Sequence, residues 1–582
     1  MAALPQPTLD TRAGVDARLQ AIDKLEELVN EVVREKVRHR SNIALKRSVR
    51  SWRKGDLVKA GQWALKATEL DAENSKAFHV LAMALERMGH LHKALVTYER
   101  AFELDPEDPE LLINLGLTAW NLKLTEGAIK MFRLYIAFCP DSPLGYNNLG
   151  SCLADMGQLD QAIETLRAAL YQMPQEAILW NSLATVLAEE GRAEESLIFY
   201  EEAARLEPKF ARAYHNLGFA YQHLSRRKEA LECYDKALEL CVDPAERVES
   251  LHSRSICLIG LGKLDEGWRE YEIRNYERFR CYFHHMIEAP RWKGEDLAGK
   301  KLLLVGEQGL GDEIMFSNIL PDAQAAVGDE GKLQICVDVR MIPLYQRSFP
   351  RAEVGTYDDR TLIDKDGNKA LRLVPFASGA NKPDCWAPMG SALQHWRDRL
   401  DKFPRKAFLL PDPKRVADFK KRLAALPGKK VGVCWRSMML TAKRAKYFSP
   451  IDSWGEILKT PGISFVNIQY GDCAADIARA EEKFGVPIHQ MKGLDLKDDI
   501  DGLAALSAAL DLVLSAPTAA AHTASSVGAK VWYLSAGVGW PQLGTAEYPW
   551  YPNTRVFWPE KFGAWDAVLP GFAKELAEFA AR

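Results

Sequence analysis

The stretch AFHVLAMALERMGHLHKALVTYERAFELDPED (residues 77–108) recurs in outline every 34 residues. In five consecutive frames, which start at residues 75, 109, 143, 177 and 211, equivalent positions hold residues of the same kind. The seventh position is leucine and the eighth is small: Leu81 and Ala82, Leu115 and Gly116, Leu149 and Gly150, Leu183 and Ala184, Leu217 and Gly218. Small residues let paired helices approach closely, so the pattern predicts stacked helix pairs, an α-solenoid.

The period of the array is that of a tetratricopeptide repeat (TPR). A degenerate copy precedes the five frames at 41–74 and another follows from about 248, which gives about seven repeats over residues 41–281. Residues 1–40 are predicted to form a helical extension, charged and amphipathic from residue 15 onward. This extension is interpreted as a cap or an oligomerisation element.

The sixth position of the frames faces the concave side of such an array and is often asparagine. The polar residues in this row are Asn114, Asn148 and Asn216, with Asn181 one place away in the fourth frame. Each amide offers two donors and one acceptor, so the row is able to bond the backbone of an extended polypeptide. Ordinary helix polarity is the alternative interpretation. The row resembles the asparagine ladder of the O-linked N-acetylglucosamine transferases, which holds protein substrates.

Beyond residue 285 the period disappears, and short apolar runs alternate with helical stretches. The runs expected to be strands are KKLLLVGE, KLQICVDV, AEVGTY and LRLVPFA, then KKVGVCWRS, ISFVNIQYG, PIHQM, DLVLSAPT and AKVWYLSA. This alternation predicts parallel sheets covered by helices. Two α/β lobes of Rossmann type, at 282–410 and 411–582, with a hinge near 405–430, correspond to a GT-B fold, in which ligands bind between the carboxyl ends of both sheets.

The segment LLLVGEQGLGDEIMFSNIL (302–320) places a glycine turn at the carboxyl end of the first strand. Gly309 and Gly311 are expected to permit a tight turn and to leave the backbone accessible. Asp312 then falls at the start of the next helix. Two roles are open for it: an N-cap, or a general base facing the cleft between the lobes. A helix N-terminus lowers the pKa of a carboxyl group, which opposes the second role unless desolvation offsets it.

The second lobe is expected to bind an activated donor. A helix that begins near Thr518 presents free N–H groups suited to a phosphate, with His522 one turn further on. Cationic candidates for the departing phosphate are Arg436, Lys443 and Arg444, and candidates in the aromatic loop 537–553 are Trp540 and Gln542. Helix capping and packing are the alternatives for Thr518, His522 and the aromatic loop, and a solvated loop is the alternative for Lys443 and Arg444.

These motifs resemble the bacterial TPR proteins whose C-terminal domain is similar to the heptosyltransferases. The similarity is carried by EQGLGDEIMF, PMGSALQHW (388–396), VGVCWRS (431–437), NIQYGD (467–472) and APTAAAHTASSVGAKVWYL (516–534). It implies that Asp312 is the base and that Thr518 and His522 contact the donor. The flagellin glycosyltransferases of polarly flagellated bacteria, which transfer pseudaminic acid, a nonulosonic acid, are the members most similar in layout.

One departure from the heptosyltransferase pattern concerns the donor. The family carries an aspartate before the threonine and a glycine after it, where this chain has Pro517 and Ala519. The missing carboxylate argues against ADP-heptose and suits a donor sugar that itself carries a carboxylate.

The resulting prediction is a metal-independent, inverting protein O-glycosyltransferase of the cytoplasm. Its expected partners are flagellin or another client protein in the repeat groove and a nucleotide-sugar donor, most simply CMP-linked, with no other cofactor. Alternatives are a flagellin scaffold or chaperone with an inactive GT-B domain and a transferase using UDP-N-acetylglucosamine. A net charge of -3 gives no general affinity for nucleic acid, and ten cysteines without a C-x-x-C pair indicate reduced thiols.

Overall fold

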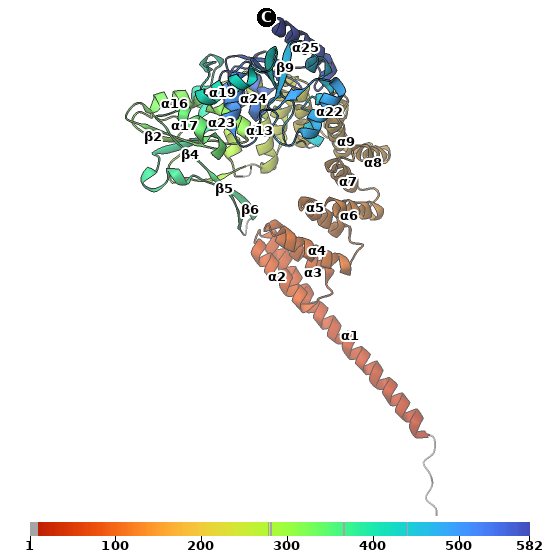
Figure 1. Cartoon of the computed structure of the whole chain (residues 1–582). Helices are drawn as coiled ribbons and strands as arrows, with labels where there is room; N and C mark the ends of the chain where they lie inside the picture. Colours follow the sequence, from red (N-terminus) through yellow and green to blue (C-terminus); the bar gives the residue numbers. More distant parts are fainter. Residues whose placement is uncertain (1–9, 278, 280–281, 365–366, 439, 441) are drawn as a thin grey trace, which may run out of the picture. The chain divides into compact units, whose positions relative to one another are not determined.

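The computed structural model describes residues 10–277, 279, 282–364, 367–438, 440 and 442–582 (Figure 1). The chain divides into two compact units: Met1–Pro174 with Ile363–Asn368, and Gln175–Leu362 with Lys369–Arg582. The division falls inside the repeat array and differs from the predicted limit at residue 281. Within each unit the helices of neighbouring repeats pack on one another, and the last repeats of the second unit also pack against the α/β region.

The first unit consists of helix pairs. Its helices are α1 (Asp10–Arg53), α2 (Leu57–Leu70), α3 (Ser75–Arg87), α4 (Leu91–Leu104), α5 (Pro109–Asn121), α6 (Thr125–Phe138), α7 (Pro143–Asp155) and α8 (Leu159–Gln172). Helix α1 continues through the predicted limit at residue 40 to Arg53, so that one 44-residue helix includes both the extension and the first half of the first repeat.

The second unit begins with three more pairs: α9 (Ala177–Glu190), α10 (Ala193–Leu206), α11 (Ala211–His223), α12 (Arg227–Leu240), α13 (Pro244–Gly260) and α14 (Leu264–Tyr271). Among the described residues the two units together contain seven pairs, as the sequence predicts.

The small eighth position of the repeat is explained by packing within each pair. A Cβ atom added at Gly116 would lie 2.6 Å from Cε1 of Phe132 on the next helix, and one added at Gly150 would lie 2.8 Å from Cδ1 of Leu166. Real carbon atoms do not approach so closely, so a larger residue would force the two helices apart.

The first sheet of the second unit is parallel and has the strand order β4-β3-β2-β7. Its strands are β2 (Lys301–Val305), β3 (Lys332–Val337), β4 (Glu353–Thr356) and β7 (Cys385–Pro388), accompanied by helices α15 (Leu310–Phe316), α16 (Leu320–Val327), α17 (Ile342–Ser348) and α18 (Met389–Trp396). The run LRLVPFA does not supply a strand of this sheet. It forms part of β6 (Gly367–Leu373), in a separate sheet with β1 (His284–Met286) and β5 (Asp358–Asp364).

The second sheet has six parallel strands in the order β10-β9-β8-β11-β12-β13. They are β8 (Lys429–Cys434), β9 (Ile463–Asn467), β10 (Ile488–His489), β11 (Leu512–Ser515), β12 (Val531–Leu534) and β13 (Thr554–Phe557). The helices are α19 (Pro413–Leu423), α20 (Ala442–Ala445), α21 (Gly455–Leu458), α22 (Ala474–Phe484), α23 (Ile500–Ala509), α24 (Ala519–Ser526) and α25 (Trp565–Ala581). Chain order reverses between β8 and β11, the position at which doubly wound sheets bind ligands.

Short 3₁₀ turns complete the secondary structure: η1 (Glu272–Asn275), η2 (Ser317–Ile319), η3 (Val339–Met341), η4 (Pro375–Ala377), η5 (Gly379–Asn381), η6 (Leu400–Lys402), η7 (Ile451–Ser453) and η8 (Trp540–Gln542). One hydrophobic cluster runs from Trp268 of α14 through Leu302 of β2 to Val513 of β11, so the last repeat and both sheets share a core. Over the described ranges, every helix is too short or too polar to cross a bilayer.

Candidate functional site

A cavity of about 370 Å³ lies at the carboxyl ends of strands from both parallel sheets. Residues that follow β2 and β3 contribute to it from the first sheet, and residues that follow β8, β9 and β11 contribute from the second. The lining residues that matter below are Gly309, Gly311, Asp312, Arg340, Arg444, Tyr470, Lys497, Pro517, Thr518, Ala519 and His522. The structure therefore brings the predicted glycine turn and the predicted donor helix to one cavity.

The turn between β2 and α15 is built differently from the prediction. The residue of this turn with a positive φ is Gln308, at 64°. Gly309 has an extended backbone, with φ -96°, and is the N-cap residue of α15. Gly311 is required for another reason: a Cβ atom there would lie 3.2 Å from Cδ2 of His522 and 3.6 Å from the backbone nitrogen of Ala519. The glycine thus allows α15 and α24 to approach closely beside the cavity.

Asp312 lies in the first turn of α15, three residues after the cap, so it is not the N-cap residue. Its half-buried carboxyl group lines the cavity. Desolvation raises the pKa of Asp312 to about 6, with a further contribution from the negative charge of Glu307, although a backbone hydrogen bond with Gly309 acts in the opposite direction. Desolvation therefore outweighs the hydrogen bond with Gly309, and a carboxylate with this pKa is suited to accept a proton near neutral pH.

The neighbouring Glu313 has a structural role that the sequence did not reveal. Its buried carboxyl group accepts hydrogen bonds from the backbone nitrogen of Asp338 (2.7 Å) and from the hydroxyl of Tyr357 (3.1 Å). Burial raises the pKa of Glu313 to about 8. The side chain therefore anchors the loop after β3 to the turn that carries Asp312.

A buried ion pair supports the same turn from the repeat side. Arg274 of η1 donates from Nε and Nη2 to the two carboxylate oxygens of Glu307, at 3.0 and 2.6 Å, and the backbone nitrogen of Gly390 donates to the same carboxylate at 2.6 Å. Burial opposes the charged form of Arg274, but the negative charges of Glu307 and Glu272 together raise the pKa of the guanidinium. The turn after β2 is thereby fixed to the end of the repeat array and to α18.

On the side of the second sheet, Thr518 occupies the N-cap position of α24 and makes no side-chain capping bond. Its hydroxyl lies 3.5 Å from Sγ of Cys434. His522 is buried in the same helix, and its Nδ1 lies 2.9 Å from the hydroxyl of Tyr551. Desolvation lowers the pKa of His522 to about 4, so the ring is neutral at physiological pH and adds no charge to the cavity.

Of the predicted cationic residues, only Arg444 is shown to line the cavity. The guanidinium of Arg436 is directed elsewhere, because its Nε donates to Asp476 at 2.8 Å and its Nη2 to the backbone oxygen of Asp472 at 2.9 Å. The side chain of Lys443 lies outside the described residues.

The aromatic loop packs into the protein instead of lining the cavity. The ring centroid of Trp540 lies 6.2 Å from that of Trp268 and 6.3 Å from that of Trp550. Gln542 is buried, and its Oε1 accepts a hydrogen bond from the backbone nitrogen of Gly539 at 2.7 Å. Neither side chain meets the cavity at Asp312.

Three of the lining residues named above, Arg340, Tyr470 and Lys497, were not among the predicted candidates. Arg340 and Tyr470 follow the ends of β3 and β9, so their position after predicted strands was a usable signal. Lys497 lies in the loop before α23, and nothing in its sequence context points to the cavity. Arg340 is held by Asp338, to which its Nε and Nη2 donate at 2.8 and 2.9 Å. Across the residues searched, His, Cys, Asp and Glu form no cluster of metal-binding size.

The asparagine row has members in both units. The amides of Asn114 and Asn216 bond to residues of the preceding repeat, whereas Oδ1 of Asn148 accepts from Nδ2 of Asn147 on its own helix at 3.1 Å. In the first unit, Nδ2 of Asn114 lies 3.0 Å from Nε2 of His79, and Asn148 is buried. In the second unit, Nδ2 of Asn216 donates to Oδ1 of Asn181 at 3.0 Å. These bonds orient the amides and use part of their hydrogen-bonding capacity.

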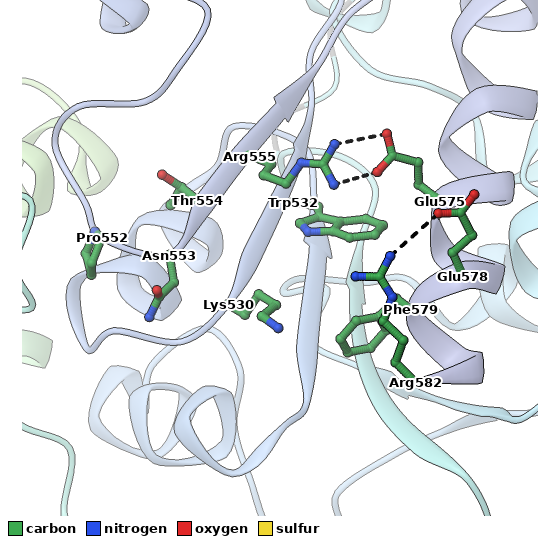
Figure 2. Close-up of a pocket in the computed structure, with 10 residues that line it drawn as sticks. All are labelled: Lys530, Trp532, Pro552, Asn553, Thr554, Arg555, Glu575, Glu578, Phe579 and Arg582. Carbon is green, nitrogen blue, oxygen red and sulfur yellow. Dashed lines mark hydrogen bonds and ion pairs between the residues drawn. The ribbon is translucent and has the colours of Figure 1, made fainter.

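A second cavity, of about 310 Å³, is shown in Figure 2. It lies at the amino end of β12 and β13, where Arg555 donates to Glu575 at 2.5 and 2.9 Å. Parallel sheets bind ligands at the opposite ends of their strands, and the Arg555 charge is already paired. The cavity at Asp312 is therefore the stronger candidate.

Comparison with known proteins identifies the repeats. Tetratricopeptide repeat models match residues 75–118, 148–209 and 211–243. Protein FlbA of Caulobacter vibrioides is 43% identical over 331 residues, which are 56% of this chain and 55% of that protein. The chain thus aligns with about half the length of this relative.

Solved repeat proteins are similar over part of the chain. YrrB, described as a TPR protein with an unusual peptide-binding site, is 24% identical over 32% of this chain and 96% of its own, with a TM-score of 0.24. TTC0263, a thermophilic TPR protein of Thermus thermophilus, is 27% identical over 31% of this chain and 98% of its own, with a TM-score of 0.28.

Proposed function

We propose that the protein is an O-glycosyltransferase, in which the repeats hold a client polypeptide and the cavity at Asp312 transfers a sugar from a nucleotide donor to Ser or Thr. The observation that carries this proposal is the meeting of two features in one cavity: a carboxyl group with a raised pKa and the N-terminus of α24. The first is suited to accept a proton and the second to bind a phosphate. The GT-B fold is part of the same proposal, supported by the two parallel sheets.

In this mechanism Asp312 accepts the proton of the client hydroxyl while the oxygen forms its bond to the anomeric carbon. The bond from that carbon to the donor phosphate breaks at the same time, which inverts the anomeric centre. The N–H groups at the start of α24 and the guanidinium of Arg444 stabilise the charge that the phosphate acquires. Arg444 takes the role first considered for Arg436, whose guanidinium is bonded to Asp476.

The cavity favours an anionic donor. Arg444 and Lys497 contribute positive charge to its lining, whereas the charge of Arg340 is paired with Asp338. Pro517 and Ala519 stand where the heptosyltransferase pattern has an aspartate and a glycine. A CMP-linked nonulosonic acid such as pseudaminic acid carries both a phosphate and a sugar carboxylate, which suits this lining. Flagellin is the proposed client, and the similarity to FlbA supports a flagellar role.

Nucleotide binding is expected to stabilise the protein. CMP at about 100 times its dissociation constant should add about 2.7 kcal/mol to the free energy of unfolding. Differential scanning fluorimetry with CMP, UDP and ADP measures this effect as a rise in Tm. A larger rise with UDP than with CMP would favour UDP-N-acetylglucosamine, and no rise with any nucleotide would contradict a working donor site.

The asparagine row gives a separate prediction for the client. Asn148→Ala combined with Asn216→Ala is expected to weaken binding of purified flagellin about tenfold, because each substitution removes an amide able to bond a polypeptide backbone. Fluorescence anisotropy measures the affinity, and the rise in Tm with CMP serves as the control for the donor site. Unchanged affinity for flagellin would contradict the ladder interpretation.

A scaffold or chaperone role for flagellin is the second candidate, favoured by family matches that fall within the repeats. Coexpression of flagellin with this chain and a nonulosonic-acid pathway separates the two. Intact mass spectrometry should show added sugar masses if the transferase proposal is right. Flagellin that remains bound but gains no mass would support the scaffold.

A further inference from the structure

Three cavities adjoin His223, at the end of helix α11, and lead from the repeats toward the cavity at Asp312. One of about 240 Å³ lies against α9 and α11 and includes Asn216 and Phe219 in its lining. A second, of about 390 Å³, also contacts Phe219 and His223 and extends to Pro517. Pro517 in turn lines the cavity that contains Asp312. The third, of about 430 Å³, opens beside His223 between α9 and Phe562.

The helix face that leads into these cavities is the one that carries the asparagine row. Asn216, Phe219 and His223 are spaced at i, i+3 and i+7 along α11, so they lie on one side of the helix. Phe219 is 47% exposed although it is a large apolar residue. Phe219 and His223 line two of the three cavities together, so the ring of Phe219 joins the asparagine face of α11 to the cavities at His223.

The part of the wall at His223 is aromatic, while Lys446 adds a positive charge to two of the three cavities. Nδ1 of His223 donates to the backbone oxygen of Phe219 at 3.1 Å, so Nε2 accepts a hydrogen bond from the hydroxyl of Tyr447 at 2.7 Å. The ring of Phe562 packs on both, with centroids 5.3 Å from His223 and 5.2 Å from Tyr447. Burial lowers the pKa of His223 to about 4, with a smaller contribution from the positive charge of Lys446, so the imidazole itself is neutral at physiological pH.

We propose that these cavities bind one extended client segment, which runs from Asn216 past Phe219, His223 and Tyr447 to Pro517 and presents its hydroxyl-bearing residue to Asp312. This inference rests on the proposed function and adds the position and chemistry of the acceptor site. Aromatic walls on the approach favour apolar side chains beside the modified Ser or Thr. The residues that flank the modified Ser or Thr in the client would then be selected by contacts beside the cavity at Asp312. The asparagines contact only the client backbone and do not discriminate among its side chains.

Photocrosslinking with purified flagellin tests the position of the segment. The photoreactive amino acid p-benzoylphenylalanine is introduced singly by Phe219→p-benzoylphenylalanine, Tyr447→p-benzoylphenylalanine and Phe562→p-benzoylphenylalanine in the full chain. Ile198→p-benzoylphenylalanine on α10, where the side chain is 64% exposed and outside these cavities, is the matched control. All three positions should crosslink to one short flagellin segment identified by mass spectrometry, and the control should not.

The assay needs neither donor nor catalysis, so its outcome is separate from that of the transfer reaction. Flagellin that binds the chain but crosslinks no better at these positions than at the control would overturn the acceptor site and leave the proposed transferase standing. Absence of flagellin binding would overturn both the acceptor site and the assignment of flagellin as client. As an independent measure, Phe219→Ala should weaken flagellin binding about tenfold, with Ile198→Ala unchanged.

Discussion

Asp312→Asn is expected to lower the rate of sugar transfer to flagellin by about 10²- to 10⁴-fold, because the amide cannot accept the proton of the client hydroxyl. The substitution keeps the size of the side chain, so the fold and the rise in Tm with CMP should be retained. Intact mass of flagellin after coexpression measures the transfer. Asp329→Asn makes the same chemical change at an exposed position of the first lobe and should leave transfer unaffected. Full activity of Asp312→Asn would end the assignment of the base.

The pH dependence follows from the same residue. Asp312 acts as a base only when ionised, and its pKa is raised to about 6, so the rate should fall as pH drops through about 6. An unperturbed aspartate would retain activity to about pH 4. Initial rates between pH 5 and 8 distinguish the two cases, provided that the Tm of the protein is recorded across the same range.

Arg274→Met should lower the free energy of unfolding by about 3 to 5 kcal/mol, because it leaves the buried carboxylate of Glu307 without its ionic partner. Urea denaturation measures the loss. The double variant Arg274→Met with Glu307→Leu removes both charges and should recover most of the stability, since a hydrophobic pair then replaces the ion pair.

Arg100→Met provides the comparison, because Arg100 pairs with Glu103 at 3.0 Å on an exposed surface. Exposed ion pairs contribute about 0 to 1 kcal/mol, so this variant should unfold at nearly the wild-type urea concentration. A loss at Arg274 no larger than that at Arg100 would show that the buried pair does not hold the turn after β2.

The repeat array was predictable because each position recurs, and repetition supplies evidence that a single segment lacks. The structure brings Asp312, Arg444, Thr518 and His522 to one cavity, and each of them follows an apolar strand that the sequence marks. The network of Arg274 and Glu307 was not predictable. It joins residues 33 positions apart on different elements, and the sequence marks neither as a partner of the other.

Two strands of the two large parallel sheets were missed for a physical reason. Cys385–Pro388 and Thr554–Phe557 have four residues each, and neither shows a long apolar or alternating run. The aromatic residues of the loop with Trp540 suggested contacts with a ligand. In the structure the ring of Trp540 instead contributes to the core shared with Trp268. Aromatic side chains serve both purposes, and only the fold distinguishes them.

The meeting of two parallel sheets at their carboxyl edges also has an evolutionary consequence. The residues that contact the cavity belong largely to loops and first helical turns. The strands that precede these loops are buried within the two sheets. Substitutions such as those at Pro517 and Ala519 therefore change the local charge without disturbing strand pairing. Under the proposed function, a lineage built on this scaffold is free to exchange one sugar donor for another through a few loop residues, and the specificity of related chains is expected to diverge faster than their architecture.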